Sequence, residues 1–178
     1  MMGRQHDIPR RRGTRARVAS TLLRATLGLA TVAGTWAMGP APARADELQR
    51  AECRVHAVLA SKAEAPERIP GNLSFLRGEL SSGQFADFKS FRLLGSTDYN
   101  LTLGNTVTRD AAAGHRVGLG LRGGSRARPS LHVEVTSAGR AKPLVSANYS
   151  VKADGFLLLA GLRHPDGRLV LAVQCHGA

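Results

Sequence analysis

The expected fold is decided by two apolar runs near the end of the chain, Phe156-Leu157-Leu158-Leu159-Ala160-Gly161-Leu162 and Arg168-Leu169-Val170-Leu171-Ala172-Val173-Gln174-Cys175. Turn-forming residues precede each run, Asp154-Gly155 before the first and Pro165-Asp166-Gly167 before the second. Short apolar runs separated by such residues are typical of β-hairpins. We therefore expect the end of the chain to form paired strands.

Apolar residues alternate with polar ones in the preceding segments as well. The alternation is clearest at Val117, Leu119 and Leu121, and again at Leu131, Val133 and Val135. A period of two indicates an antiparallel sheet with one buried face, and the connections are too short for parallel crossovers. The strands expected by this pattern are 51–59, 90–94, 99–103, 106–108, 116–121, 131–136, 144–152, 155–162 and 168–175. The prediction is a mainly β protein, an antiparallel sandwich or a barrel-like meander.

One short helix is expected near residues 72–82. Asn72 can cap its start, and Leu73, Leu76 and Leu80 follow at helical spacing. Four of the five Phe residues lie in or just after this segment, and we expect their rings to pack on the sheet; they are Phe75, Phe85, Phe88 and Phe91.

The first 45 residues have the layout of a secretory signal peptide. An Arg-rich region ends at Arg24, an apolar stretch runs from Leu27 to Met38, and Ala43 and Ala45 flank Arg44 in a small-x-small pattern. Cleavage after Ala45 is expected, with Ala43 as the second choice and an uncleaved anchor or twin-arginine export as alternatives. The net charge of +12 is concentrated here, because eight of the 25 basic residues and one of the 13 acidic residues precede Asp46. Residues 46–178 are expected to form a single β-rich domain without a membrane span.

Two cysteines occupy the first and last expected strands. Cys53 and Cys175 share the parity of the apolar residues around them, whereas His56 and His176 fall on the opposite parity. In an exported protein this arrangement favours a disulfide between Cys53 and Cys175. Free buried thiols and a tetrahedral metal site that also uses the two histidines remain the alternatives.

Motifs that carry known chemistry are absent from the sequence. The pattern Gly118-x-Gly120-x-x-Gly123 leads into a loop and a strand rather than the helix that dinucleotide binding needs. His132-x-Glu134 lacks the later cysteine pair of the zinc deaminases. The five histidines after residue 45 are each expected to be exposed strand or turn residues. No catalytic residue, metal or cofactor is predicted.

The middle loops are basic and are the candidate anion-binding loops. They carry Arg116, Arg122, Arg126, Arg128, Arg140 and Lys142. Such side chains attract anionic polymers, but no aromatic residue lies among them to stack on bases. The partner is therefore unknown from the sequence; an envelope protein or an anionic polymer is the candidate, without specific nucleic-acid recognition.

Several segments together resemble a group of small exported uncharacterised β-rich proteins of myxobacteria and related bacteria, which carry no assigned activity. The likeness covers most of residues 53–175 and is carried by the segments 55–61, 73–80, 85–94 and 169–173. A bacterial source also fits the 21 Arg against 4 Lys, a bias typical of genomes rich in G and C. The resemblance implies a secreted β-rich domain and no particular catalysis.

The function expected from the sequence is that of an exported protein of the periplasm or extracellular space, acting by binding or assembly in the cell envelope. It is not expected to be an enzyme. The alternative is an envelope hydrolase or metal-dependent enzyme whose site is assembled from His and Asp or Glu by the fold.

Overall fold

The computed structural model describes residues 47–178. The predicted signal peptide and its cleavage site lie outside these residues. The elements in order are β1 (Arg50–Ser61), the 3₁₀ helix η1 (Gly71–Leu76), α1 (Arg77–Leu80), the 3₁₀ helix η2 (Gly83–Phe85), β2 (Ser90–Thr102), β3 (Thr106–Asp110), β4 (His115–Ser125), β5 (Arg128–Ser137), β6 (Val145–Ser150), β7 (Phe156–His164) and β8 (Gly167–Gly177). Among residues 47–178, no helix has the length and apolar character needed to cross a membrane.

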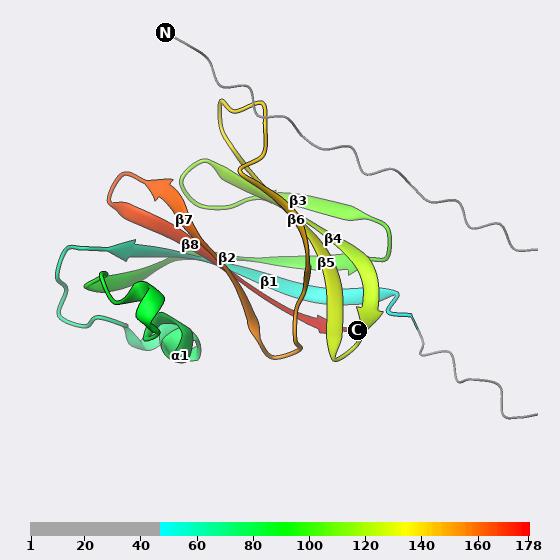
Figure 1. Ribbon diagram of the computed structural model, residues 1–178, viewed down its shortest axis with the longest axis horizontal. Helices are drawn as coiled ribbons and strands as arrows, with labels where there is room; N and C mark the ends of the chain where they lie inside the picture. The colour runs from blue at the N-terminus through cyan, green and yellow to red at the C-terminus, as the bar shows by residue number, and fades with distance from the viewer. Residues whose placement is uncertain (1–46) are drawn as a thin grey trace, which may run out of the picture. The chain divides into compact units, whose positions relative to one another are not determined.

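The eight strands form two four-stranded sheets. Sheet A has the order β2-β1-β8-β7 and sheet B the order β3-β4-β5-β6, and all neighbours in both sheets are antiparallel. The inner faces of both sheets contribute to one hydrophobic core, so the strands form a sandwich (Figure 1). The prediction of a mainly β, antiparallel fold with one short helix is confirmed, and of the two predicted architectures the two separate sheets fit the sandwich.

Period-two alternation places the core residues as expected. Val117, Leu119 and Leu121 of β4 and Leu131, Val133 and Val135 of β5 are all fully buried. From sheet A they meet Val55, Leu169 and other inward-facing residues of β1 and β8. Burial of these apolar side chains is the main favourable contribution to the stability of the sandwich.

Tyr99 of β2 adds a polar link between the two sheets. Its hydroxyl donates a hydrogen bond to the carbonyl oxygen of Val117 in β4, at 3.2 Å. Burial of the ring raises the pKa of Tyr99 to about 12, so the phenol remains a protonated donor at neutral pH.

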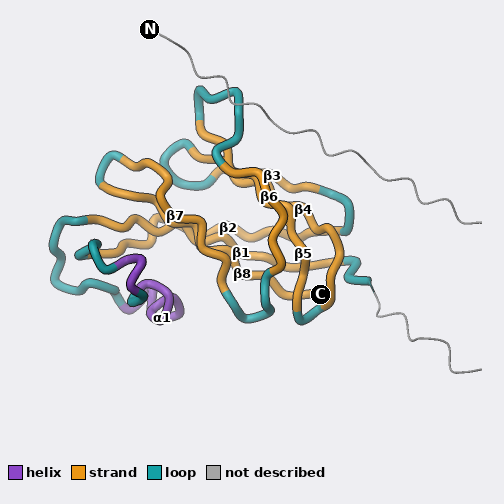
Figure 2. Tube along the Cα trace, in the orientation of Figure 1, coloured by secondary structure: helices purple, strands orange, loops and turns teal. Residues whose placement is uncertain are grey.

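Part of sheet A is buried on its outer face too. The cover is the helical segment from Gly71 to Phe85, which lies beside sheet A on the side away from β3–β6 (Figures 1 and 2). Three leucines of this segment, Leu73, Leu76 and Leu80, are part of a second apolar cluster. The outward-facing residues of β1 and β8 in the same cluster are Val58, Ala60, Val170 and Ala172.

The helical segment is less regular than the sequence predicts. The first part of the expected helix is 3₁₀, and only one turn, α1, is α-helical. A 3₁₀ helix aligns residues three apart, which brings Leu73 and Leu76 to the same side. Asn72 does not cap the segment: Pro70 occupies that position, and Asn72 is exposed inside η1. Gly78 also weakens the α-helix, because its backbone is costly to order.

The two strands predicted at 90–94 and 99–103 are one continuous strand, β2, which contains a bulge. The register against β1 shifts between Ala57 and Val58, so that Ala57 pairs with Gly95 while Val58 pairs with Leu93. The extra residue reverses which side chains face outward. Phe91 and Leu93 therefore pack against the helical segment, and the later polar residues of β2 share that outer face.

Cys53 and Cys175 form a disulfide, as predicted. The two residues are direct cross-strand partners in β1 and β8, with Cα atoms 4.1 Å apart, and both side chains lie in the core. Strand parity was the correct guide, because His56 and His176 project from the opposite face. The alternatives of free thiols and of a metal site with cysteine ligands are wrong.

Candidate functional site

The outer face of sheet A carries a group of polar side chains where the helical segment does not cover it. We call this group the polar face; it consists of Glu52, Arg54, His56, Ser96, Asp98, Asn100, Gln174 and His176. Strand register arranges the group in rows across the sheet. One row contains, from β2 to β7, Asp98, Arg54, Gln174 and Phe156. The rows on either side are Asn100, Glu52 and His176, and Ser96, His56, Ala172 and Leu158.

An ion pair lies at the centre of the polar face. The Nε of Arg54 donates a hydrogen bond to Oδ1 of Asp98, and both side chains are exposed. This hydrogen bond lowers the pKa of Asp98, and that of Arg54 is raised by the same contact. Asp98 therefore remains ionised, and the two charges largely cancel.

His56 is the buried member of the polar face, only 7% exposed. Its Nδ1 lies 2.7 Å from the Oγ of Ser96, and its ring centroid is 4.6 Å from that of Phe75. Burial is the main cause that lowers the pKa of His56, and the positive charge of Arg54 acts in the same direction. Asp98 opposes the shift in part, so the imidazole is neutral at pH 7.

Two phenylalanines border the polar face. Phe75 of η1 is 42% exposed, and its ring centroid lies 6.0 Å from that of Phe156 in β7. Phe156 is half-buried and is the cross-strand partner of Gln174. These two aromatic rings thus lie at the edge of the polar rows of sheet A.

A shallow depression of about 400 Å³ lies over the polar face. Polar residues from three strands of sheet A line it, among them Glu52, Asn100, Gln174 and His176. These side chains include hydrogen-bond donors and acceptors, and they belong to a rigid sheet. The depression can therefore bind a polar ligand laid across the strands.

The buried imidazole makes the stability of the protein depend on pH. Because the pKa of His56 is lowered in the folded state, the unfolded chain binds more protons below pH about 6.5. We expect the free energy of unfolding to fall between pH 7.5 and pH 5, and to fall less in H56Q. Urea unfolding at both pH values measures this, with H176Q as the control on the exposed part of the face. Equal losses in the wild type and H56Q would contradict the expectation.

The predicted anion-binding loops do not form one surface. Arg116, Arg140 and Lys142 lie toward the end of sheet B where His115 pairs with Ser137. Arg122, Arg126 and Arg128 lie at the other end, around the β4–β5 turn. Arg116 and Arg122 are six positions apart along β4, which corresponds to about 20 Å. Arg116 pairs with Asp110 at 3.1 Å; the other five form no ion pair with any residue of the range 47–178.

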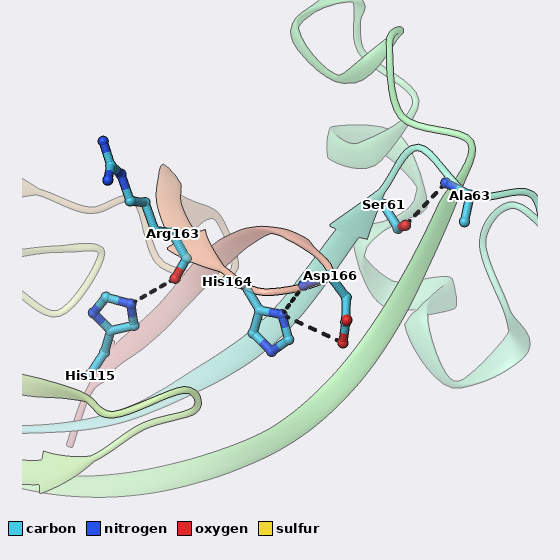
Figure 3. A network of polar contacts seen from close by, with 6 residues as sticks. All are labelled: Ser61, Ala63, His115, Arg163, His164 and Asp166. Carbon is cyan, nitrogen blue, oxygen red and sulfur yellow. Dashed lines mark hydrogen bonds and ion pairs between the residues drawn. The ribbon is translucent and has the colours of Figure 1, made fainter.

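Two of the five histidines are buried, contrary to the prediction that all are exposed. His56 is covered by Phe75, and His115 lies at the start of β4 beneath β7. The Nε2 of His115 donates to the carbonyl oxygen of Arg163, at 3.2 Å (Figure 3). Its Nδ1 is buried without a hydrogen-bond partner among the described residues.

A second polar network lies at the β7–β8 turn and contains Ser, His and Asp. His164 Nδ1 accepts a hydrogen bond from the backbone N–H of Asp166 at 3.1 Å, and Ser61 Oγ accepts one from Ala63 N–H (Figure 3). No hydrogen bond joins Ser61 to His164 within residues 47–178. These contacts stabilise two chain reversals and do not assemble a nucleophile with its base.

The His56–Ser96 contact comes closest to a nucleophile and base. A hydrolase of this kind needs a third group that orients the imidazole through its other nitrogen. Within the described range, the only hydrogen bond of the His56 ring is the one to Ser96, and the carboxylate of Asp98 is engaged by Arg54. No group of three or more His, Cys, Asp or Glu side chains suited to a metal ion is found among residues 47–178.

Sequence reasoning missed most of the polar face. Ser96, Asp98 and Asn100 alternate with Thr97 and Tyr99, and this period-two polarity was the available signal. Gln174 and Phe75 gave no signal of their own, because their place beside β1 depends on strand register and on the helical cover.

Comparison of the chain with protein-family models, curated proteins and solved structures finds no match.

Proposed function

We propose that the protein is an exported component of the bacterial cell envelope that acts by binding, through the polar face of sheet A, and not by catalysis. The observation that carries the proposal is the polar face itself. Charged, amide and imidazole side chains of three strands gather there, and the exposed ring of Phe75 contacts one of the group, His56. Such convergence of polar groups is typical of a binding site.

Export is supported by the disulfide. Disulfides persist in oxidising compartments such as the periplasm and the extracellular space, and Cys53–Cys175 joins the two central strands of sheet A. The layout of residues 1–45 and the resemblance to small exported β-rich proteins support the same location. Protein recovered from the envelope fraction is therefore expected to begin at Asp46.

Binding is preferred to catalysis because the polar face is built for hydrogen bonding. Its central charges pair with each other, and its imidazole is buried, neutral and held by Ser96. These groups can hold a polar ligand, but they do not supply an activated nucleophile with an oriented base.

Site-specific photocrosslinking tests the proposal. A photoreactive amino acid replaces Asn100 on the polar face, or Asn148 on the outer face of sheet B as the matched control, in the full exported chain. Both positions are exposed asparagines in outer-facing strand positions. We expect irradiation of intact cells to give a covalent adduct from position 100 and none from position 148, detected by mass. Adducts from neither position, or equal adducts from both, would overturn the assignment of the polar face.

A further inference from the structure

We infer that the ligand of the polar face is an uncharged oligosaccharide, whose sugar ring stacks on Phe75 while its hydroxyl groups bond to the polar rows. This inference rests on the proposed function and names the class of its ligand. Pyranose rings present C–H groups on their faces and hydroxyl groups around their rims. A complementary site therefore needs an exposed aromatic ring next to side chains that both donate and accept hydrogen bonds.

The aromatic ring is Phe75. Its neighbours in η1, Leu73 and Leu76, point into the second apolar cluster and are fully buried, whereas Phe75 remains 42% exposed. Phe75 and Leu144 are the exposed large apolar side chains among residues 47–178. The Phe75 ring is also held in place, with His56 on one side at 4.6 Å and Phe156 at 6.0 Å. It can therefore offer apolar surface to a ligand at little cost in conformational entropy.

Polar groups of the required kinds adjoin this ring. His56, which contacts Phe75, is two residues from Arg54 on the same face of β1, a separation of about 7 Å. Gln174 lies between Arg54 and Phe156 in the central row. Amides donate and accept, carboxylates accept, and guanidinium groups donate. A chain of a few sugar units laid from Phe75 toward Asn100 meets all three kinds.

The charge of the polar face favours an uncharged ligand. Arg54 is paired with Asp98, and the carboxylate of Glu52 lies two residues from the exposed Arg50 on the same face of β1, so the formal charges of this face sum to zero. A polyanion would gain little from this face, because its arginines are matched by Asp98 and Glu52. Phe75 stands alone as an exposed apolar side chain here, so the surface also lacks the contiguous apolar area that a lipid bilayer would need.

The test measures binding of defined sugars to the full exported protein, purified in its oxidised form. The probes are linear tetramers of β-1,4-linked N-acetylglucosamine, glucose and mannose, with heparin as the polyanion. Affinity is measured by calorimetry, and contact with aromatic protons by saturation-transfer NMR. We expect at least one neutral tetramer to bind and heparin to bind no more tightly. F75A is expected to weaken binding at least tenfold, Q174A at least threefold and L144A less than twofold.

Two further results separate a wrong ligand from a misfolded variant or a wrong site. F75W should retain binding, because it keeps an aromatic surface at the same place. Equal affinity in F75A and the wild type would overturn the inference. If no neutral tetramer binds while photocrosslinking from position 100 succeeds, the ligand class is wrong and the binding face stands. If both experiments fail, the proposed function fails with the inference.

Discussion

Replacement of both cysteines by alanine, C53A with C175A, is expected to lower the free energy of unfolding by about 4 kcal/mol. The disulfide joins residues 122 positions apart, and a crosslink that closes so long a loop removes much of the entropy of the unfolded chain. Both side chains lie in the core, so alanine leaves no unpaired polar group behind. For a domain of this size the loss corresponds to a fall of roughly 15 °C in the midpoint of thermal unfolding.

Urea unfolding followed by circular dichroism measures this effect. The reduced wild-type protein also lacks the crosslink and serves as a comparison, because reduction breaks the disulfide without removing the sulfur atoms. We expect the reduced wild type and the double variant to have similar stabilities. A loss below about 1 kcal/mol in both would show that the disulfide contributes little to folding stability.

Truncation of Leu76 to alanine is expected to lower the free energy of unfolding by about 2–5 kcal/mol. Leu76 is fully buried in the second apolar cluster, and a large-to-small change there loses apolar contacts and leaves a cavity. F75A provides the matched control at the adjacent position, where the side chain is partly exposed and its removal leaves no cavity in the core. We expect F75A to cost less than about 1 kcal/mol.

Urea unfolding measures both variants, and limited proteolysis reports on the helical segment directly. L76A should expose residues 71–85 to cleavage at lower protease concentration than F75A does. Equal stability of the two variants would mean that the helical segment is not an integral part of the folded domain. The unfolding measurement on F75A also tests whether this variant is folded, which is a requirement for its use in the sugar-binding experiment.

Much of the fold was predictable because it depends on local alternation. The parity of Cys53 relative to Val55, and of Cys175 relative to Val173, placed both thiols on the buried face of their strands. Period two is a property of each strand alone, so it can be recognised without knowing the partner strands. The strand order was not predictable in this way, because β1 pairs with β8 across almost the whole domain.

The sequence did not predict which residues are buried on the outer face of sheet A. His56 was correctly placed opposite Cys53, but its burial depends on η1, which arrives from another part of the chain. The bulge opposite Ala57 was equally hidden, since nothing in residues 90–102 marks the reversal of parity. As a result, the polar face could be identified only after the register of β1, β2 and β8 was known.

The central position of β1 and β8 in sheet A has a consequence for the order of folding. Among the strands of residues 47–178, β1 is synthesised first and β8 last, so the middle of this sheet cannot close until β8 has been made. At about 5–20 residues per second, Cys53 waits on the order of ten seconds for Cys175. Throughout that interval the edge of β1 that later pairs with β8 is open, which favours pairing with other chains. Until β8 is available, this edge of β1 is therefore the part of sheet A most open to pairing with other chains.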